Sequence, residues 1–207
     1  MKLERFMYLN VAGAASLYSQ LRGEDVVETL YSMEHSKASG LKFALSAFLG
    51  GGAESSAISK ESNSKKTSLR AENMIREIVA SLGAHGTLHH SIRAALTATD
   101  STSAPAWFDA KHPFSMPFSI DECNRERTVV FHSGYTRHGI SIDGEPHIRM
   151  PASLNHFPSA YEGQLRISGH EAMLFRSLNG SEHLFSVFGS IFRAGDSYQV
   201  NPYAIRY

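Results

Sequence analysis

Seven short segments rich in β-forming residues follow one another between Arg127 and the last residue. They are RTVVFH, HGISID, HIRMP, GQLRIS, AMLFRS, HLFSVFGSIFR and YQVNPYAIRY. Two-residue hairpin signals, Asp143-Gly144 and Asn179-Gly180, stand between some of them. Short strands joined by tight turns predict an antiparallel sheet or a small barrel over residues 120–207.

The start of the chain predicts one strand and then helices. Phe6, Tyr8 and Leu9 suit a half-buried strand, and Val11 begins an Ala-rich segment whose apolar residues recur at helical spacing. Because the last segment, PYAIRY, is rich in core-forming residues, we expect the first strand and residues 200–207 to share one sheet or adjoining sheets.

Two further helices are expected in the middle of the chain. SLRAENMIREIVASLG carries a continuous apolar stripe between Ser68 as N-cap and Gly83, and a second helix is expected over about Leu88–Thr97. The Gly-, Ser- and Lys-rich residues 50–68 are interpreted as a flexible loop, and residues 98–119, with three prolines, as loop-like. The predicted class is α+β, with region 1–100 beside region 120–207 or both in one integrated domain.

Composition narrows the function classes. Of 207 residues 42% are hydrophobic, and the 20 basic and 20 acidic residues cancel, so no global attraction to a polyanion is expected. No apolar run approaches the ~20 residues that span a bilayer, and FMYLNVAGAA is not typical of a signal peptide. The single cysteine, Cys123, excludes an intrachain disulfide. We expect a soluble cytoplasmic protein without a cofactor.

The histidine group AHGTLHH is the tightest candidate metal site in the sequence. His85 and His89 stand at the i, i+4 spacing that binds Zn²⁺ on a helix, and His90 follows. Gly83 and Gly86 argue against a helix there, and no Glu stands where a zincin needs its base. The alternative is a set of polar residues at the start of a helix.

Nucleic-acid binding and thiol chemistry have weaker signals. The helices over 69–97 carry Arg93, and three lysines of the predicted loop would meet an anionic partner: Lys60, Lys65 and Lys66. A packing αα-hairpin is the simpler interpretation of the same helices. Cys123 lies in the charged segment DECNRER, which is predicted to be a loop, and nothing pairs it with a particular histidine.

The helix after the first strand is almost free of charge. Its small and apolar residues Ala14, Ala15 and Tyr18 allow close packing of helices, either within the fold or across a contact between subunits. This face is the candidate assembly surface.

The two ends of the chain together resemble an uncharacterised family of bacterial proteins. Its members begin with a strand of the type Phe-Ile-Tyr-Leu-Asp and a helix containing Ser-Leu-Tyr-Ser-Gln, which correspond here to residues 6–10 and 16–20. FGSIFR and VNPYAIRY are similar to the family's glycine-centred strand and Pro-x-Ala-Ile-Tyr ending. The resemblance implies a bacterial accessory protein, of a kind often found in phage-conflict gene neighbourhoods, and it carries no catalytic residues because the family has no assigned activity.

Three functions follow as hypotheses. The first is a non-enzymatic binding or assembly module, in antiviral defence or another accessory system, whose partner is itself or another protein. The second is a nucleic-acid-binding protein that uses helices 69–97. The third is a His-dependent metal hydrolase.

Overall fold

The structure is a computed structural model that describes residues 6–22, 58–116, 120–134, 142, 144–157, 175–176 and 181–207. The chain forms two compact units: one contains the described residues of Met1–Asn10 and Leu82–Tyr207, and the other those of Val11–Ser81. The described residues form helices and a mixed seven-stranded sheet, which confirms the predicted α+β class. The units do not coincide with the expected regions 1–100 and 120–207.

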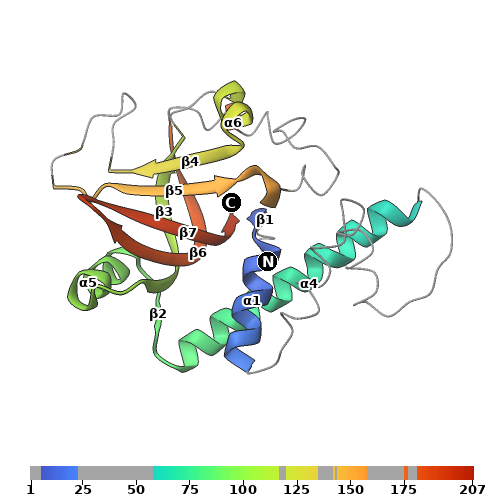
Figure 1. The fold of residues 1–207 in the computed structure, drawn as a ribbon, viewed down its shortest axis with the longest axis horizontal. Helices are drawn as coiled ribbons and strands as arrows, with labels where there is room; N and C mark the ends of the chain where they lie inside the picture. The colour runs from blue at the N-terminus through green and yellow to red at the C-terminus, as the bar shows by residue number, and fades with distance from the viewer. Residues whose placement is uncertain are drawn as a thin grey trace. The chain divides into compact units, whose positions relative to one another are not determined.

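The sheet of the first unit closes on itself (Figure 1). Hydrogen-bonded pairs run from β3 to β4, β5, β7, β6 and back to β3, so these five strands form a small barrel, one of the two architectures that the sequence left open. Most pairs are antiparallel, but β2–β3 and β5–β7 are parallel. The strands are β1 (Phe6–Leu9), β2 (Leu88–His89), β3 (Ala106–Ser115), β4 (Thr128–Ser133), β5 (Ile148–Ser153), β6 (Glu182–Ala194) and β7 (Ser197–Arg206).

Strands β3 and β7 lie on either side of β6 and pair with it. At its other edge, each of them pairs with two different strands at different points along its length. On β7, residues 198–199 pair with β5 and residues 204–206 pair with β1. On β3, residues 107–108 pair with β2, and Ser115 pairs with His132 of β4. The pairing of β1 with the end of β7 confirms that the first and last predicted strands share a sheet.

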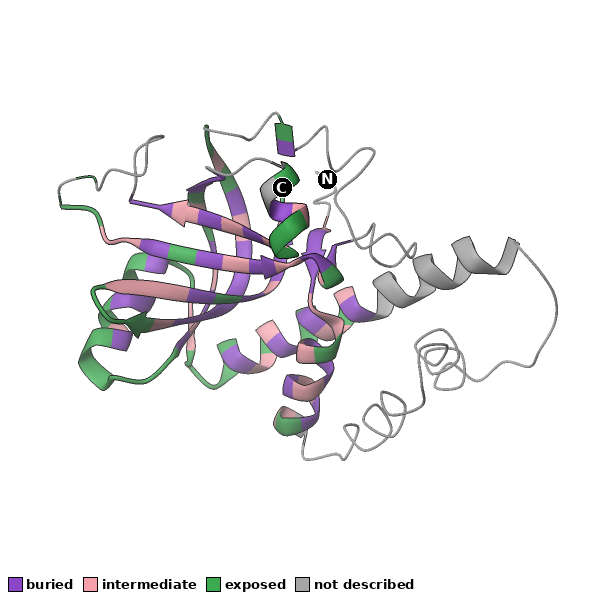
Figure 2. Cartoon of the chain, turned by 45° about the horizontal axis from the view of Figure 1, so that its top comes forward, coloured by how far each residue is buried: buried purple, intermediate pink, exposed green. Residues whose placement is uncertain are grey.

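The interior of the barrel is filled by side chains. Alternation along each strand points every second residue inward, where it is buried, as the alternating burial colours of Figure 2 show. Eight of these residues are nearly free of solvent contact: Phe108, Phe114, Val129, Phe131, Ile148, Met150, Phe185 and Val187. Aromatic rings meet inside, for example Phe131 and Phe185 with centroids 5.5 Å apart. A packed core of this kind leaves ligand binding to the outer surface.

Three segments around the barrel differ from the sequence interpretation. Residues 106–115 form β3 and are not a loop. The helix expected at about Leu88–Thr97 is α5 (Ile92–Thr102), because Leu88 and His89 instead form β2. Cys123 lies in a short helix, α6 (Ile120–Glu126), and not in a loop. Helix α5 buries Ile92, Ala95, Leu96 and Thr99, the i, i+3, i+4, i+7 spacing of one helical face, and it packs against β3 and β6.

The second unit contains α1 (Val11–Arg22) and most of α4 (Ile58–Ala84). The hydroxyl of Tyr18 on α1 donates a hydrogen bond of 2.8 Å to the carboxylate of Glu77 on α4. Helix α4 confirms the predicted helix but begins ten residues before Ser68, so the part of the expected 50–68 loop from residue 58 onward is helical.

Other predicted segments lie partly or wholly outside the described residues. These are most of HGISID, all of GQLRIS, and Asn179-Gly180. Of AMLFRS, Phe175 and Arg176 are described, and both are helical and not extended. Among the described helices, none is both long and apolar enough to cross a bilayer.

Candidate functional site

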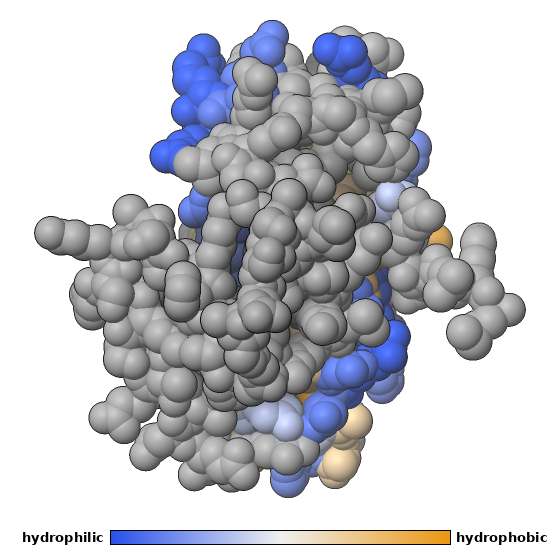
Figure 3. Space-filling model, turned by 90° about the vertical axis from the view of Figure 1, so that its right-hand side faces the viewer, coloured by the Kyte–Doolittle hydropathy of each residue, from blue (hydrophilic) through white to orange (hydrophobic). Residues whose placement is uncertain are grey.

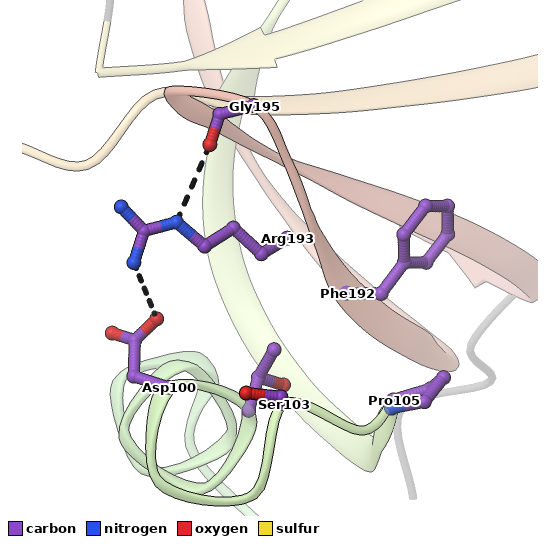
Figure 4. A pocket seen from close by; sticks show the side chains of 7 residues that line it. Asp100, Ser103, Pro105, Phe192, Arg193 and Gly195 are labelled. Carbon is purple, nitrogen blue, oxygen red and sulfur yellow. Dashed lines mark hydrogen bonds and ion pairs between the residues drawn. The ribbon is translucent and has the colours of Figure 1, made fainter.

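An open pocket lies at the surface of the protein between the end of α5 and the hairpin that joins β6 to β7 (Figure 4). Its volume is about 520 Å³, within the range of small-molecule and side-chain sites. The lining residues are Thr99, Asp100, Ser103, Pro105, Phe192, Arg193 and Gly195. The pocket therefore combines an apolar wall with one carboxylate and one guanidinium.

The helix side of the pocket is built where α5 ends. Ser103 follows the last helical residue with φ 54°, in the left-handed region, and its N–H donates to the carbonyl of Thr99 at 2.8 Å. The hydroxyl of Thr99 donates 3.1 Å to the carbonyl of Ile191 on β6 and fixes this end of the helix to the barrel. Pro105 then leads the chain into β3.

The hairpin side depends on a two-residue turn. Ala194 pairs with Ser197, and Gly195 has φ +65° at the first of the two turn positions, which a type II′ turn gives to Gly. The sequence carried this signal, Gly195-Asp196 between two β-rich segments, but our sequence analysis used only Asp143-Gly144 and Asn179-Gly180. The turn places Phe192 and Arg193 beside α5.

Asp100 is the centre of the polar contacts. The hydroxyl of Tyr198 on β7 donates to both carboxylate oxygens of Asp100, at 2.8 and 2.6 Å, and this hydrogen bond raises the pKa of Tyr198. The guanidinium Nη1 of Arg193 stands 3.5 Å from Asp100 Oδ1, and its Nε donates to the carbonyl of Gly195 at 3.3 Å. The site holds and orients charge, but it contains no nucleophile beside a base.

A second polar group lies on the inner face of the barrel, where β4 ends. His112 Nε2 and Ser133 Oγ are 2.8 Å apart, and Ser133 is buried. Burial lowers the pKa of His112 to about 4, with an opposing effect from Glu145, so the imidazole is neutral at pH 7. A neutral imidazole beside a hydroxyl is also the pair that a serine nucleophile needs, but the inward position of Ser133 makes mutual hydrogen bonding the simpler role. The sequence analysis did not single out either residue.

The predicted metal ligands are not brought together on a helix. His85 is exposed in the turn after α4, His89 lies in β2, and His90 is exposed just after it. No group of three or more His, Cys, Asp or Glu side chains among the described residues could hold a metal ion. The i, i+4 argument fails because α4 ends at Ala84, before His85, and Gly86, with φ +68°, lies in the turn that leads to β2.

The residues proposed for nucleic-acid binding lie on different helices. Arg93 is exposed near the start of α5, and Lys60, Lys65 and Lys66 lie in the first part of α4, where the expected loop is helical. Of the candidate assembly surface, Ala14 and Ala15 are buried in the single chain, and Tyr18 is half-buried and bonded to Glu77.

Exposed apolar surface is sparse on the described part of the chain. The most exposed large apolar side chains there are Ile142, Leu184 and Tyr207, of which Leu184 is 63% exposed. On the face drawn in Figure 3, the described side chains in view are mostly hydrophilic. Scattered single residues of this kind do not form a docking patch. Among the described residues, the pocket beside α5 is therefore the better candidate site.

Comparison with protein-family models found no match, and comparisons with curated proteins and with solved structures found no significant one. The resemblance to an uncharacterised bacterial family therefore stays a prediction.

Proposed function

We propose that this chain is a non-enzymatic binding module, with the barrel as scaffold and the pocket beside α5 as the place where a protein partner docks. The observation that supports it best is the contrast between a barrel interior filled mainly by apolar side chains and an open surface pocket that offers both apolar and charged groups. A partner side chain that enters the pocket would meet Phe192 and Pro105 together with the pair Asp100–Arg193.

The surrounding chemistry agrees with binding better than with catalysis. The Asp100–Arg193 pair is exposed and the Tyr198 hydroxyl already donates to Asp100, so these groups recognise shape and charge without a reacting atom between them. The antiviral context is a further expectation that rests on the sequence resemblance.

Site-specific photocrosslinking in the native host tests the proposal. A photoreactive p-benzoylphenylalanine replaces Asp196, which is exposed in the turn beside the pocket. The matched control replaces Glu182, which is exposed at the opposite end of β6. We expect one discrete crosslinked protein from position 196 and none from position 182. The same products from both positions, or none from either, would contradict a partner at this pocket.

A further inference from the structure

The pocket beside α5 contains several acceptor groups that attract positive charge, together with one resident cation. Helix α5 directs its C-terminal carbonyls, the negative end of its dipole, toward Ser103 at the pocket. Helices commonly compensate this end with a basic residue, but the last turn of α5 contains none. The carboxylate of Asp100, in the same last turns, and the carbonyl of Gly195 add two further acceptors.

Arg193 supplies the one cation among the lining residues, and it comes from β6 and not from the helix. Its contacts are long: 3.5 Å from Nη1 to Asp100 Oδ1 and 3.3 Å from Nε to the carbonyl of Gly195. Its side chain is 62% exposed and that of Asp100 is 42% exposed. Exposed pairs of this geometry contribute little stability, so the guanidinium of Arg193 is easily displaced.

The acceptor, in contrast, is fixed in place. Tyr198 donates to both carboxylate oxygens of Asp100 at 2.8 and 2.6 Å, and the backbone N–H of Tyr198 is itself bonded to the carbonyl of His147 at 2.8 Å. Phe192 and Pro105 line the pocket with apolar surface. The ring of Phe192 points away from Asp100 and Arg193 (Figure 4), so the aliphatic part of a long basic side chain would pack against Pro105.

We propose that this pocket binds a cationic group of its partner, an arginine guanidinium or a lysine ammonium, which displaces the guanidinium of Arg193 from Asp100. Arg193 then acts as a resident competitor that occupies the site when no partner is bound. The inference rests on the proposed function, because it uses the same pocket, and it adds the chemical class of the ligand.

Titration with small probes tests the ligand class. The full chain, labelled with ¹⁵N, is titrated with N-acetyl-arginine methylamide, with the neutral citrulline analogue and with the acidic N-acetyl-glutamate methylamide. We expect shifts in the amide signals of residues 99–105 and 192–196 with the arginine probe alone. Shifts with the glutamate probe in place of the arginine probe, or equal shifts with arginine and citrulline, would overturn the proposal.

Two variants give a more specific test, because the proposal predicts that they change binding of the arginine probe in opposite directions. Arg193→Ala removes the competitor and should strengthen binding of the arginine probe severalfold, whereas Asp100→Asn should abolish it. Matched controls are Arg93→Ala, an exposed arginine at the other end of α5, and Asp121→Asn, an exposed aspartate on α6. Neither control should change binding. Weaker binding by Arg193→Ala would mean that Arg193 is itself the recognition group.

The photocrosslinking experiment distinguishes a failure of this inference from a failure of the proposed function. When Arg193→Ala is added to the variant with the crosslinker at position 196, we expect the partner crosslink to persist or increase. If the wild-type background gives the crosslink and Arg193→Ala removes it, the pocket binds a partner but not through a cation. If the crosslink forms neither with wild-type Arg193 nor with Arg193→Ala, the proposed function itself is wrong.

Discussion

Arg206 of β7 and Asp109 of β3 form an ion pair across the strand that separates them. Both strands pair with β6, where Asp109 is opposite Phe188 and Arg206 is opposite Ser186, so the pair crosses β6 diagonally on the outer face of the barrel. The two side chains are only 16% and 19% exposed. The guanidinium of Arg206 also lies 5.9 Å from the ring centroid of Phe6 on β1. One side chain thus connects three strands.

Removal of the carboxylate from this pair should destabilise the barrel. Asp109→Ala removes one counter-charge from the largely buried guanidinium of Arg206, and we expect a loss of about 2–4 kcal/mol in the free energy of unfolding, measured with urea. Asp109→Asn should cost less because the amide oxygen still accepts a hydrogen bond. Asp121→Ala, at an exposed site, is the control and should change stability by less than about 0.5 kcal/mol. Equal effects at 109 and 121 would show that the pair contributes nothing.

Two glycines with nearly the same φ angle allow the cost of backbone strain to be distinguished from the cost of a steric clash. Gly134 and Gly144 have φ +77° and +78°, so alanine is strained at either position. A Cβ at Gly134 would lie 2.3 Å from the carbonyl oxygen of Pro146, whereas a Cβ at Gly144 has nothing within 4 Å. We expect Gly144→Ala to cost about 1 kcal/mol and Gly134→Ala at least ~2 kcal/mol more, from thermal or urea unfolding. Similar costs would mean that the backbone at Pro146 yields freely.

Acid should weaken the barrel through two histidines beside the β3–β4 contact. Burial lowers the pKa of His112 and His132 from 6.5 to about 4, and Arg149, which is opposite His132 on β5, adds to the effect at His132. Because the unfolded chain binds these protons more readily, stability is present above pH 6.5 and is lost as the pH falls from 6.5 to about 4. Both side chains are partly exposed, so solvent screening reduces the effect. We therefore expect each histidine to lower the free energy of unfolding by about 1–2 kcal/mol at low pH.

The measurement is the free energy of unfolding of wild type and His112→Gln/His132→Gln at pH 7.0, 6.0 and 5.0. We expect the double variant to be less stable than wild type at pH 7.0, and its free energy of unfolding to fall less between pH 7.0 and 5.0. His90→Gln, at an exposed position, should keep the wild-type pH dependence. If the double variant follows the wild-type curve, other groups cause the acid sensitivity.

The barrel was predictable because its strands carry their own pattern, but β3 was not. In AWFDAKHPFS the apolar residues Ala106, Phe108, Ala110 and Phe114 alternate as a strand requires. The lysine, the histidine and Pro113 concealed this pattern. A proline is tolerated there because residues 109–114 lie between the pairings of β3 with β2 and with β4, so one edge of β3 has no ladder partner there among the described strands.

The pocket could not be predicted for a different reason. Asp100 and Tyr198 are 98 residues apart, and they meet only because β3, β6 and α5 pack together after the barrel closes. The spacing of residues within a short stretch of sequence cannot predict a contact over such a separation. The α1 face illustrates the opposite case, since its apolar pattern predicted the burial of Ala14 and Ala15 without indicating what covers them.

The sole cysteine should be unreactive in the folded protein. Cys123 looked accessible in a charged loop, but it is buried on α6, with 2% of its surface exposed. A thiol reagent reaches a buried side chain only when the helix opens, so we expect modification by 5,5′-dithiobis(2-nitrobenzoate) at least about a hundredfold slower in native buffer than in urea. The control is Asp121→Cys in a Cys123→Ser background, which places a thiol on the exposed side of the same helix and should react at nearly the unfolded rate. Equal native rates for Cys123 and for this control would show that α6 opens freely.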